Sequence, residues 1–189
     1  LNLVKNRIRG QQIVTVNAEF VMLAQRDKKF LQILNNADLS VPDSAWVRDA
    51  KLILGGKCHD KVPGVDLVET LCSEAAEKAV TIGFLGGFGS VAERVSKRQK
   101  EKHPGLIVKL AEAGDPAIGY DLRLKGRLEA LGGVDILFVS YGMGQQEHWI
   151  DRNRQKLPVG VLIGVGGALD YISGEKRRAP KKKKKKNVE

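Results

Sequence analysis

Short apolar runs alternate along the chain with longer segments in which apolar residues recur at every third or fourth position. The short runs contain few polar residues and many β-branched ones, which is typical of strands buried on both faces of a sheet. The longer segments have one apolar face, which is typical of amphipathic helices that pack on such a sheet. The pattern predicts strands or extended segments at 12–16, 39–42, 80–85, 106–110, 136–139 and 159–165.

Helices are expected between these strands, and several follow residues suited to cap them. Asn17, Asp43 and Ser44 each precede a helical pattern, and their side-chain oxygens can accept backbone N–H groups. A break is expected near Asp27. The pattern predicts helical segments at 20–34, 46–54, 65–79, 91–102, 121–131 and from 145 onward. In the segment 121–131 the expected apolar positions are Leu122, Leu124, Leu128 and Leu131.

The alternation of strands and helices predicts a Rossmann-like α/β fold, with a mostly parallel sheet and helices on both faces. A length of 189 residues suits a single domain, which we place at 1–175, followed by a basic tail at 176–189 that is expected to be disordered. Three glycine-rich turns follow predicted strands, at 86–90, 141–144 and 166–170. Because the carboxyl ends of parallel strands meet at one edge, these turns are expected to gather there with Thr15, Asn17 and Asp43.

The stretch 134–153 joins a buried strand, a glycine turn and a polar helix start. Such a turn directs free backbone N–H groups to one place, where an anion is favoured. We interpret it as one wall of a nucleotide-sugar site, although an ordinary strand-to-helix connection has the same pattern. The turn at 86–90 repeats the arrangement, but its spacing is not that of the dinucleotide fingerprint.

The net charge of +10 is concentrated at the end of the chain. Residues 175–189 hold nine Lys or Arg and two Glu, which leaves a charge of only +3 for the remainder. A nearly neutral body and an aromatic content of 5% argue against a nucleic-acid partner. The run Lys181–Lys186 is either a solvated tail or a segment attracted to anionic lipid head groups.

Two cysteines, Cys58 and Cys72, are too few for a disulfide framework. Cys72 lies on the apolar face of a predicted helix and is interpreted as a core residue. Cys58-His59-Asp60 combines metal-ligand types, but no second ligand cluster follows at a usable spacing, so a surface loop is expected. No apolar run reaches roughly 18 residues, so no membrane-spanning helix is expected.

Six segments spread over residues 14–180 together resemble the WecG/TagA/CpsF family of glycosyltransferases. They read VTVNAEF (14–20), ADLSVPD (37–43), VPGVDL (62–67), FLGGFGS (84–90), VDILFVSYGMGQQEHWIDRN (134–153) and IGVGGALDYISGEKRRAP (163–180). The resemblance implies an inverting transferase that moves N-acetylmannosamine, or its uronic acid, from a UDP-sugar to N-acetylglucosamine on undecaprenyl diphosphate. It also implies a role in the synthesis of wall teichoic acid or other surface polysaccharides, in a cytoplasmic protein associated peripherally with the inner face of the cell membrane.

The resemblance further implies roles for individual residues. Asp43 matches the family's general base, although the next residue, usually glycine, is Ser44 here. Thr15 and Asn17 match a T-x-N motif on the acceptor side, and Gln146 matches the glutamine of a QE-x-W motif that usually follows a proline. The candidate catalytic residues are therefore Asp43, Thr15 and Gln146. The candidate substrate-binding residues are Asn17, Gly86, Gly87, Ser90, Tyr141, Gly142, Gly144, Glu147, Gly166, Gly167, Asp170 and Arg178.

Displacement at a sugar carbon requires a base near the attacking hydroxyl and stabilisation of the leaving UDP. No two aspartates are separated by one residue, so the usual Asp-x-Asp metal ligands are missing and a metal-independent reaction without a cofactor is expected. Backbone N–H groups, together with Arg152 or an arginine of the tail, are expected to stabilise the diphosphate instead. Without the resemblance, Asp43 is equally well explained as a helix cap, Thr15 as a strand residue and Gln146 as a helix residue.

In members of the family a further helical stretch follows the basic segment, and it is implied to hold the protein at the membrane and to complete the active site. We expect the sequence to stop just before that stretch, so that the chain binds UDP but transfers sugar poorly. Self-association through exposed apolar surface is a further option. Two other function classes remain open, a non-catalytic nucleotide-binding module and a nucleic-acid-binding protein led by the lysine run, and the donor sugar is not determined.

Overall fold

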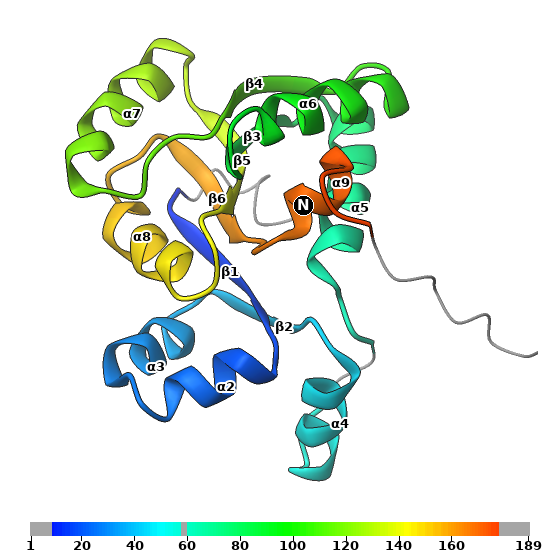
Figure 1. The fold of residues 1–189 in the computed structure, drawn as a ribbon, viewed down its shortest axis with the longest axis vertical. Helices are drawn as coiled ribbons and strands as arrows, with labels where there is room; N and C mark the ends of the chain where they lie inside the picture. Colours follow the sequence, from blue (N-terminus) through cyan, green and yellow to red (C-terminus); the bar gives the residue numbers. More distant parts are fainter. Residues whose placement is uncertain (1–8, 58–59, 178–189) are drawn as a thin grey trace, which may run out of the picture.

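A six-stranded sheet, in which every strand pairing is parallel, forms the centre of the molecule (Figure 1). The computed structural model describes residues 9–57 and 60–177. Within these ranges the strand order is β2-β1-β6-β5-β3-β4. The strands are β1 (Gln11–Val16), β2 (Leu39–Pro42), β3 (Thr81–Gly86), β4 (Ile107–Glu112), β5 (Val134–Ser140) and β6 (Val159–Gly164). The predicted α/β fold with a mostly parallel sheet is confirmed.

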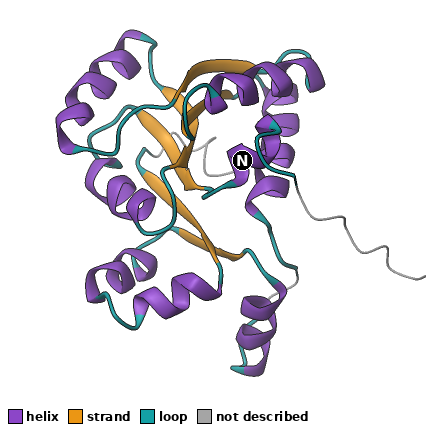
Figure 2. Cartoon of the chain, viewed as in Figure 1, coloured by secondary structure: helices purple, strands orange, loops and turns teal. Residues whose placement is uncertain are grey.

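Helices cover both faces of this sheet (Figure 2). They are α2 (Ala18–Ala24), α3 (Lys28–Asn35), α4 (Ala45–Ile53), α5 (Gly64–Lys78), α6 (Val91–Lys102), α7 (Ile118–Ala130), α8 (Gln145–Asn153) and α9 (Ala168–Ser173). Asn17 and Asp27 cap α2 and α3, since their Oδ1 atoms accept the N–H groups of Phe20 and Phe30 at 3.0 and 2.9 Å. The predicted cap at Asn17 and the predicted break near Asp27 are therefore confirmed.

Two apolar layers hold the helices against the sheet. On one face, α5, α6 and α9 pack on the strands around Phe84 and Phe138, whose ring centroids lie 5.6 Å apart. Cys72 of α5 is fully buried in this layer, where burial raises the pKa of its thiol to about 12, so its interpretation as a core residue is confirmed. On the other face, α7 and α8 pack on β5 and β6.

Helix α7 begins three residues before its predicted start and presents a narrower apolar face than expected. Leu124 and Leu128 are buried against the sheet, as the helical spacing predicted. Leu122 is 81% exposed and Leu131 is 39% exposed, so these two apolar positions are not covered by the sheet. Helical spacing identifies candidate apolar positions, but the neighbouring elements decide which of them are covered.

Neighbouring strands of the sheet send the chain to opposite faces. β1 leads into α2 and α3, which lie beside α8, whereas its neighbour β6 leads into α9 on the other face. In the same way β5 leads into α8, and its neighbour β3 leads into α6 on the opposite face. Where such connections diverge, a crevice opens at the carboxyl ends of the strands. The topology therefore favours openings along this edge.

Some sequence-based expectations fall outside the described residues, namely those for Cys58, His59 and the end of the chain from Arg178, which includes Lys181–Lys186. Within the described ranges, none of the helices has both the length and the apolar character needed to cross a membrane.

Candidate active site

Two cavities lie side by side at the carboxyl edge of the sheet. The first has a volume of about 420 Å³, and the residues predicted as functional that line it are Thr15, Asn17, Asp43, Gln146, Gly166 and Gly167. The second has a volume of about 480 Å³, and the predicted residues that line it are Gly87, Tyr141, Gly142, Gly166, Gly167 and Asp170. Gly166 and Gly167 line both cavities, so the turn after β6 is their common wall.

Asp43 reaches the first cavity because it directly follows β2. Its backbone N–H donates to the carbonyl oxygen of Val16 at 2.8 Å, which extends the pairing of β2 with β1 by one residue. Its carboxylate Oδ1 accepts the N–H of Gly64, the first residue of α5, at 2.8 Å. The cap of α4 is Ser44, so Asp43 does not cap the helix that follows it, contrary to one sequence-based alternative. The acid is half-buried and held in the cavity wall.

Thr15 and Asn17 lie at the end of β1, next to Asp43 in the same cavity. The hydroxyl of Thr15 donates to the carbonyl oxygen of Gly164 at 3.0 Å, which ties β1 to β6 at their carboxyl ends. Asn17 uses its side-chain oxygen to cap α2. Each residue therefore makes a hydrogen bond that supports the fold and also lines the first cavity. A role as a strand residue or as a helix cap accounts for only part of what Thr15 and Asn17 do.

Gln146 and Glu147, at the start of α8, form a buried polar bridge between two of the glycine turns. The Gln146 Nε2 atom donates to Glu147 Oε1 at 2.7 Å, and Gln146 Oε1 accepts the N–H of Gly166 at 3.0 Å. The Glu147 Oε2 atom accepts the N–H of Gly144 at 2.7 Å. This bridge fixes the turn before α8 relative to the turn after β6.

Neither residue of the bridge presents much surface to a ligand. Gln146 lines the first cavity but is only 1% exposed. Glu147 is fully buried and lines neither of the two cavities, so the structure places it beneath the site, contrary to its prediction as a substrate-binding residue. Gly144 belongs to the turn predicted to bind an anion, and its N–H donates to the Glu147 carboxylate.

Burial raises the pKa of Glu147 to about 7, against the opposing effect of the hydrogen bonds from Gln146 and Gly144, which stabilise the carboxylate. The carboxyl group is thus close to its protonation midpoint under neutral conditions. A buried, ionised carboxylate has no water around it and is stabilised only by its hydrogen-bond donors. The protonation state of Glu147 is therefore coupled to the positions of both turns.

Three of the remaining predicted residues line neither of the two cavities: Gly86, Gly144 and Ser90. Gly86 has a φ of +105°, and a Cβ atom there would lie 2.4 Å from the carbonyl oxygen of Ser140. A glycine at this position is therefore required for the close approach of β3 and β5. Ser90 precedes α6, and its hydroxyl accepts a hydrogen bond from Arg94 at 3.3 Å. Arg178 is outside the described residues.

Arg152, one of the cations predicted for the diphosphate, lies away from both cavities. Arg152 donates to both carboxylate oxygens of Asp121, at 2.8 and 3.2 Å, and to the carbonyl oxygen of Pro116 at 2.8 Å. These bonds connect α8 to α7, and Arg152 lines neither of the two cavities. Among the described residues, the cation that lines the second cavity is Lys176.

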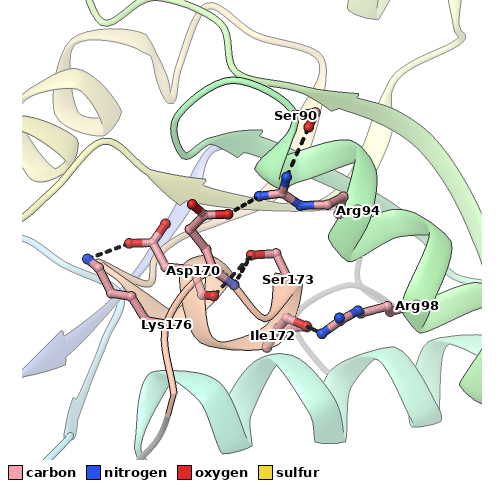
Figure 3. A network of polar contacts seen from close by, with 8 residues as sticks. Ser90, Arg94, Arg98, Asp170, Ile172, Ser173 and Lys176 are labelled. Carbon is pink, nitrogen blue, oxygen red and sulfur yellow. Dashed lines mark hydrogen bonds and ion pairs between the residues drawn. The ribbon is translucent and has the colours of Figure 1, made fainter.

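A polar network holds Lys176 beside the second cavity (Figure 3). Its Nζ lies 2.7 Å from Asp170 Oδ2, and this bond raises the pKa of Lys176 and keeps it charged. Its backbone N–H donates to the carbonyl oxygen of Asp170 at 3.1 Å. The adjacent residue Glu175 pairs with Arg94 of α6 at 2.5 Å. Lys176 belongs to the segment 163–180 that carries the family resemblance, in which Arg178 was the predicted substrate-binding cation.

No group of three or more His, Cys, Asp and Glu side chains suited to a metal ion occurs within residues 9–57 and 60–177. The chemistry that the described site offers consists of one half-buried acid, buried amides, turns with backbone N–H groups and one lysine.

A parallel sheet whose carboxyl edge carries an acid and glycine turns around two adjoining cavities defines a Rossmann-like protein with a divided ligand crevice. More particularly, the chain belongs to the WecG/TagA/CpsF family of glycosyl transferases, whose family model matches residues 1–189.

The chain is also similar in sequence to proteins whose names state an activity. The chain is 30% identical over 174 residues to an N-acetylglucosaminyldiphosphoundecaprenol N-acetyl-beta-D-mannosaminyltransferase of Bacillus spizizenii, which covers 91% of the chain and 66% of that protein. It is 29% identical to proteins of the same description from Bacillus subtilis, over 90% of the chain and 66% of the relative, and from Staphylococcus aureus, over 94% and 68%. The chain thus spans about two thirds of the length of these relatives.

The buried position of Glu147 predicts a specific pH dependence of stability. Its pKa is about 7 in the folded protein and 4.5 as the reference value, so its contribution is fully present below about pH 4.5 and is lost as the pH rises through 7. The expected loss in the free energy of unfolding is on the order of 3 kcal/mol. Glu147→Gln should remove this slope, measured by urea unfolding between pH 4.5 and 8.

Glu93→Gln on the exposed side of α6 is the matched control and should keep the wild-type slope. A Glu147→Gln variant with the same pH slope as the wild type would show that the carboxyl group does not titrate as its burial requires.

Proposed function

We propose that this chain carries the catalytic domain of a glycosyltransferase that moves N-acetylmannosamine, or its uronic acid, from a UDP-sugar to N-acetylglucosamine linked to undecaprenyl diphosphate. The names of the relatives support the acceptor and the transferred sugar. The observation that carries the proposal is the position of Asp43, a half-buried acid in the wall of a cavity that adjoins a second one.

In this proposal the acceptor sugar lies in the first cavity and the UDP group in the second. The first cavity contains the acid and two further polar residues, Thr15 and Asn17, which suit a sugar with several hydroxyl groups. The second contains Lys176 and the glycine turns after β3 and β5, whose backbone can approach phosphate oxygens closely. The sugar to be transferred would lie across Gly166 and Gly167, the wall common to both.

The proposed reaction is a direct displacement at the anomeric carbon. The oxygen of the acceptor hydroxyl attacks the anomeric carbon of the donor sugar and forms a bond to it. Asp43 takes the proton of that hydroxyl. The bond between that carbon and the UDP oxygen breaks on the opposite side, and its electron pair leaves with UDP. Lys176 and backbone N–H groups stabilise the negative charge that develops on the diphosphate. Attack and departure on opposite sides invert the anomeric configuration.

The acceptor lipid also implies where the protein works. Undecaprenyl diphosphate is held in a membrane by its isoprenoid chain, so the first cavity must come close to the membrane surface during the reaction. We propose that the protein acts on the cytoplasmic side as a peripheral membrane protein in the synthesis of teichoic acid or a related surface polysaccharide.

Asp43→Asn tests the role of the acid. Asparagine keeps an oxygen that can accept the N–H of Gly64 but cannot take a proton, so the turnover number should fall by about 10²- to 10⁴-fold. UDP affinity, measured by calorimetry, should change less than about twofold, since the acid lies outside the second cavity. Turnover would be followed with UDP-N-acetylmannosamine and a lipid-linked N-acetylglucosamine acceptor.

Glu77→Gln, at an exposed position of α5 and outside both cavities, is the matched control and should transfer sugar at the wild-type rate. Full turnover by Asp43→Asn would exclude this acid as the base. Loss of turnover in both variants would mean that the effect does not depend on the site.

We further propose that the transfer requires no divalent metal ion. The sequence has no Asp-x-Asp pair, and Lys176 together with backbone N–H groups can supply the positive charge that the leaving diphosphate needs. Turnover in excess EDTA should therefore stay within about twofold of its value with magnesium. A protein that EDTA inactivates and that magnesium or manganese restores would contradict this proposal.

A further inference from the structure

Helix α4 presents its apolar side to solvent. Trp46, Ala50 and Ile53 recur at intervals of four and three residues and therefore lie on one face of the helix. Trp46 is 83% exposed, Ile53 is 85% exposed, and Leu54, which ends the helix, is 86% exposed. None of the nine residues of α4, all of which the structure describes, is buried. In a globular protein, the apolar face of an amphipathic helix normally packs against the core of the same protein.

Positive charge accompanies the exposed apolar face. Lys51 lies in the last turn of α4, and Lys57 and Lys61 follow it in the connection to α5; all three are exposed. Arg48 is paired with its neighbour Asp49 at 2.7 Å. A helix with aromatic and aliphatic residues on one face and lysines on the other and at its end has the composition of an interfacial membrane helix.

The position of α4 relates this face to the first cavity. The helix begins two residues after Asp43, beyond the carboxyl end of β2. Figure 1 shows that it stands apart from the other helices, beyond the edge of the sheet on which the site is built. A surface that contacts α4 would therefore lie beside the cavity that contains the acid.

We propose that α4 binds the surface of an anionic lipid bilayer, with Trp46, Ile53 and Leu54 at the boundary between head groups and acyl chains and with Lys51 and Lys57 at the lipid phosphates. The inference rests on the proposed function, because an acceptor whose lipid chain stays in the bilayer can reach Asp43 only if the first cavity faces the membrane. Within the described residues, the α4 region combines exposed apolar side chains with exposed lysines and begins two residues after Asp43.

The charges favour lipid over a second copy of the chain. In a symmetric dimer each partner contributes the same patch, so two copies of a region with net positive charge would come together. An anionic bilayer instead offers phosphates to the lysines and hydrocarbon to the apolar face.

The two tryptophans of the chain provide a direct test. Trp46 is 83% exposed on α4, whereas Trp149 is 1% exposed in the core. Phosphatidylglycerol vesicles with brominated acyl chains should quench the fluorescence of Trp46, because bromine quenches only at contact. Trp46→Phe should show no such quenching, since Trp149 stays inside the protein. Wild-type fluorescence that brominated vesicles leave unchanged would overturn the proposal.

A matched pair of variants tests whether α4 also drives binding. Ile53→Glu with Leu54→Glu should weaken partitioning to phosphatidylglycerol vesicles by about tenfold or more, measured by co-sedimentation. Ile118→Glu with Leu122→Glu on α7, where these side chains are 72% and 81% exposed, should weaken it less than about twofold. Equal effects of the two pairs would contradict a specific role for α4.

Two further measurements separate the alternatives. Sedimentation velocity without lipid should give the same mass for the wild type and the α4 pair, and a wild-type oligomer that the α4 pair dissociates would identify α4 as a protein interface and overturn the proposal. The α4 pair should also keep its affinity for UDP. If vesicle binding depends on α4 but no variant binds UDP or transfers sugar, the proposed function fails while the membrane contact stands.

Discussion

All strand pairings in the sheet are parallel, so every strand brings its carboxyl end to the same edge. This constraint collects residues that are far apart in the sequence: the acid after β2, the polar residues at the end of β1, and the glycine turns after β3, β5 and β6. Where neighbouring strands direct the chain to opposite faces, the edge opens into cavities. The divided crevice follows from the strand order, and the side chains determine what each half can bind.

Within this edge, hydrogen bonds between different turns determine the geometry of the site. The Gln146 amide connects the start of α8 to the turn after β6, and Glu147 connects the same helix to the turn before it. Thr15 ties β1 to β6, and Asp43 ties β2 to α5. Most of the polar residues around the first cavity are therefore held in place before any ligand arrives. Such preorganisation reduces the cost of ordering side chains when a substrate binds.

The sequence was a good guide to the fold, because strands buried on both faces must be apolar runs and the helices between them carry caps with recognisable chemistry. It was less informative about which apolar positions are covered. Leu122 of α7 and Ile53 of α4 have helical spacing, yet both face solvent, because a periodic pattern defines a face without saying what packs on it.

The candidate site shows a similar division. Motifs correctly grouped Thr15, Asn17 and Asp43, because these residues end parallel strands. They could not distinguish a residue that lines a cavity from one that supports the lining, so Glu147 was expected at the surface although it lies beneath it. Arg152 and Lys176 are both cations near glycine turns in the sequence, and only three-dimensional packing shows that one bonds to Asp121 and the other lines a cavity.

The most direct test of the divided crevice is a calorimetric comparison of UDP and UMP binding to wild-type protein, Lys176→Gln and a control, Lys97→Gln, on the exposed side of α6. If Lys176 contacts the second phosphate, the wild type and the control should prefer UDP, and Lys176→Gln should lose about tenfold or more of that preference, as expected for a hydrogen bond to a charged group. An undiminished preference for UDP in Lys176→Gln would contradict the assignment of the diphosphate to the second cavity.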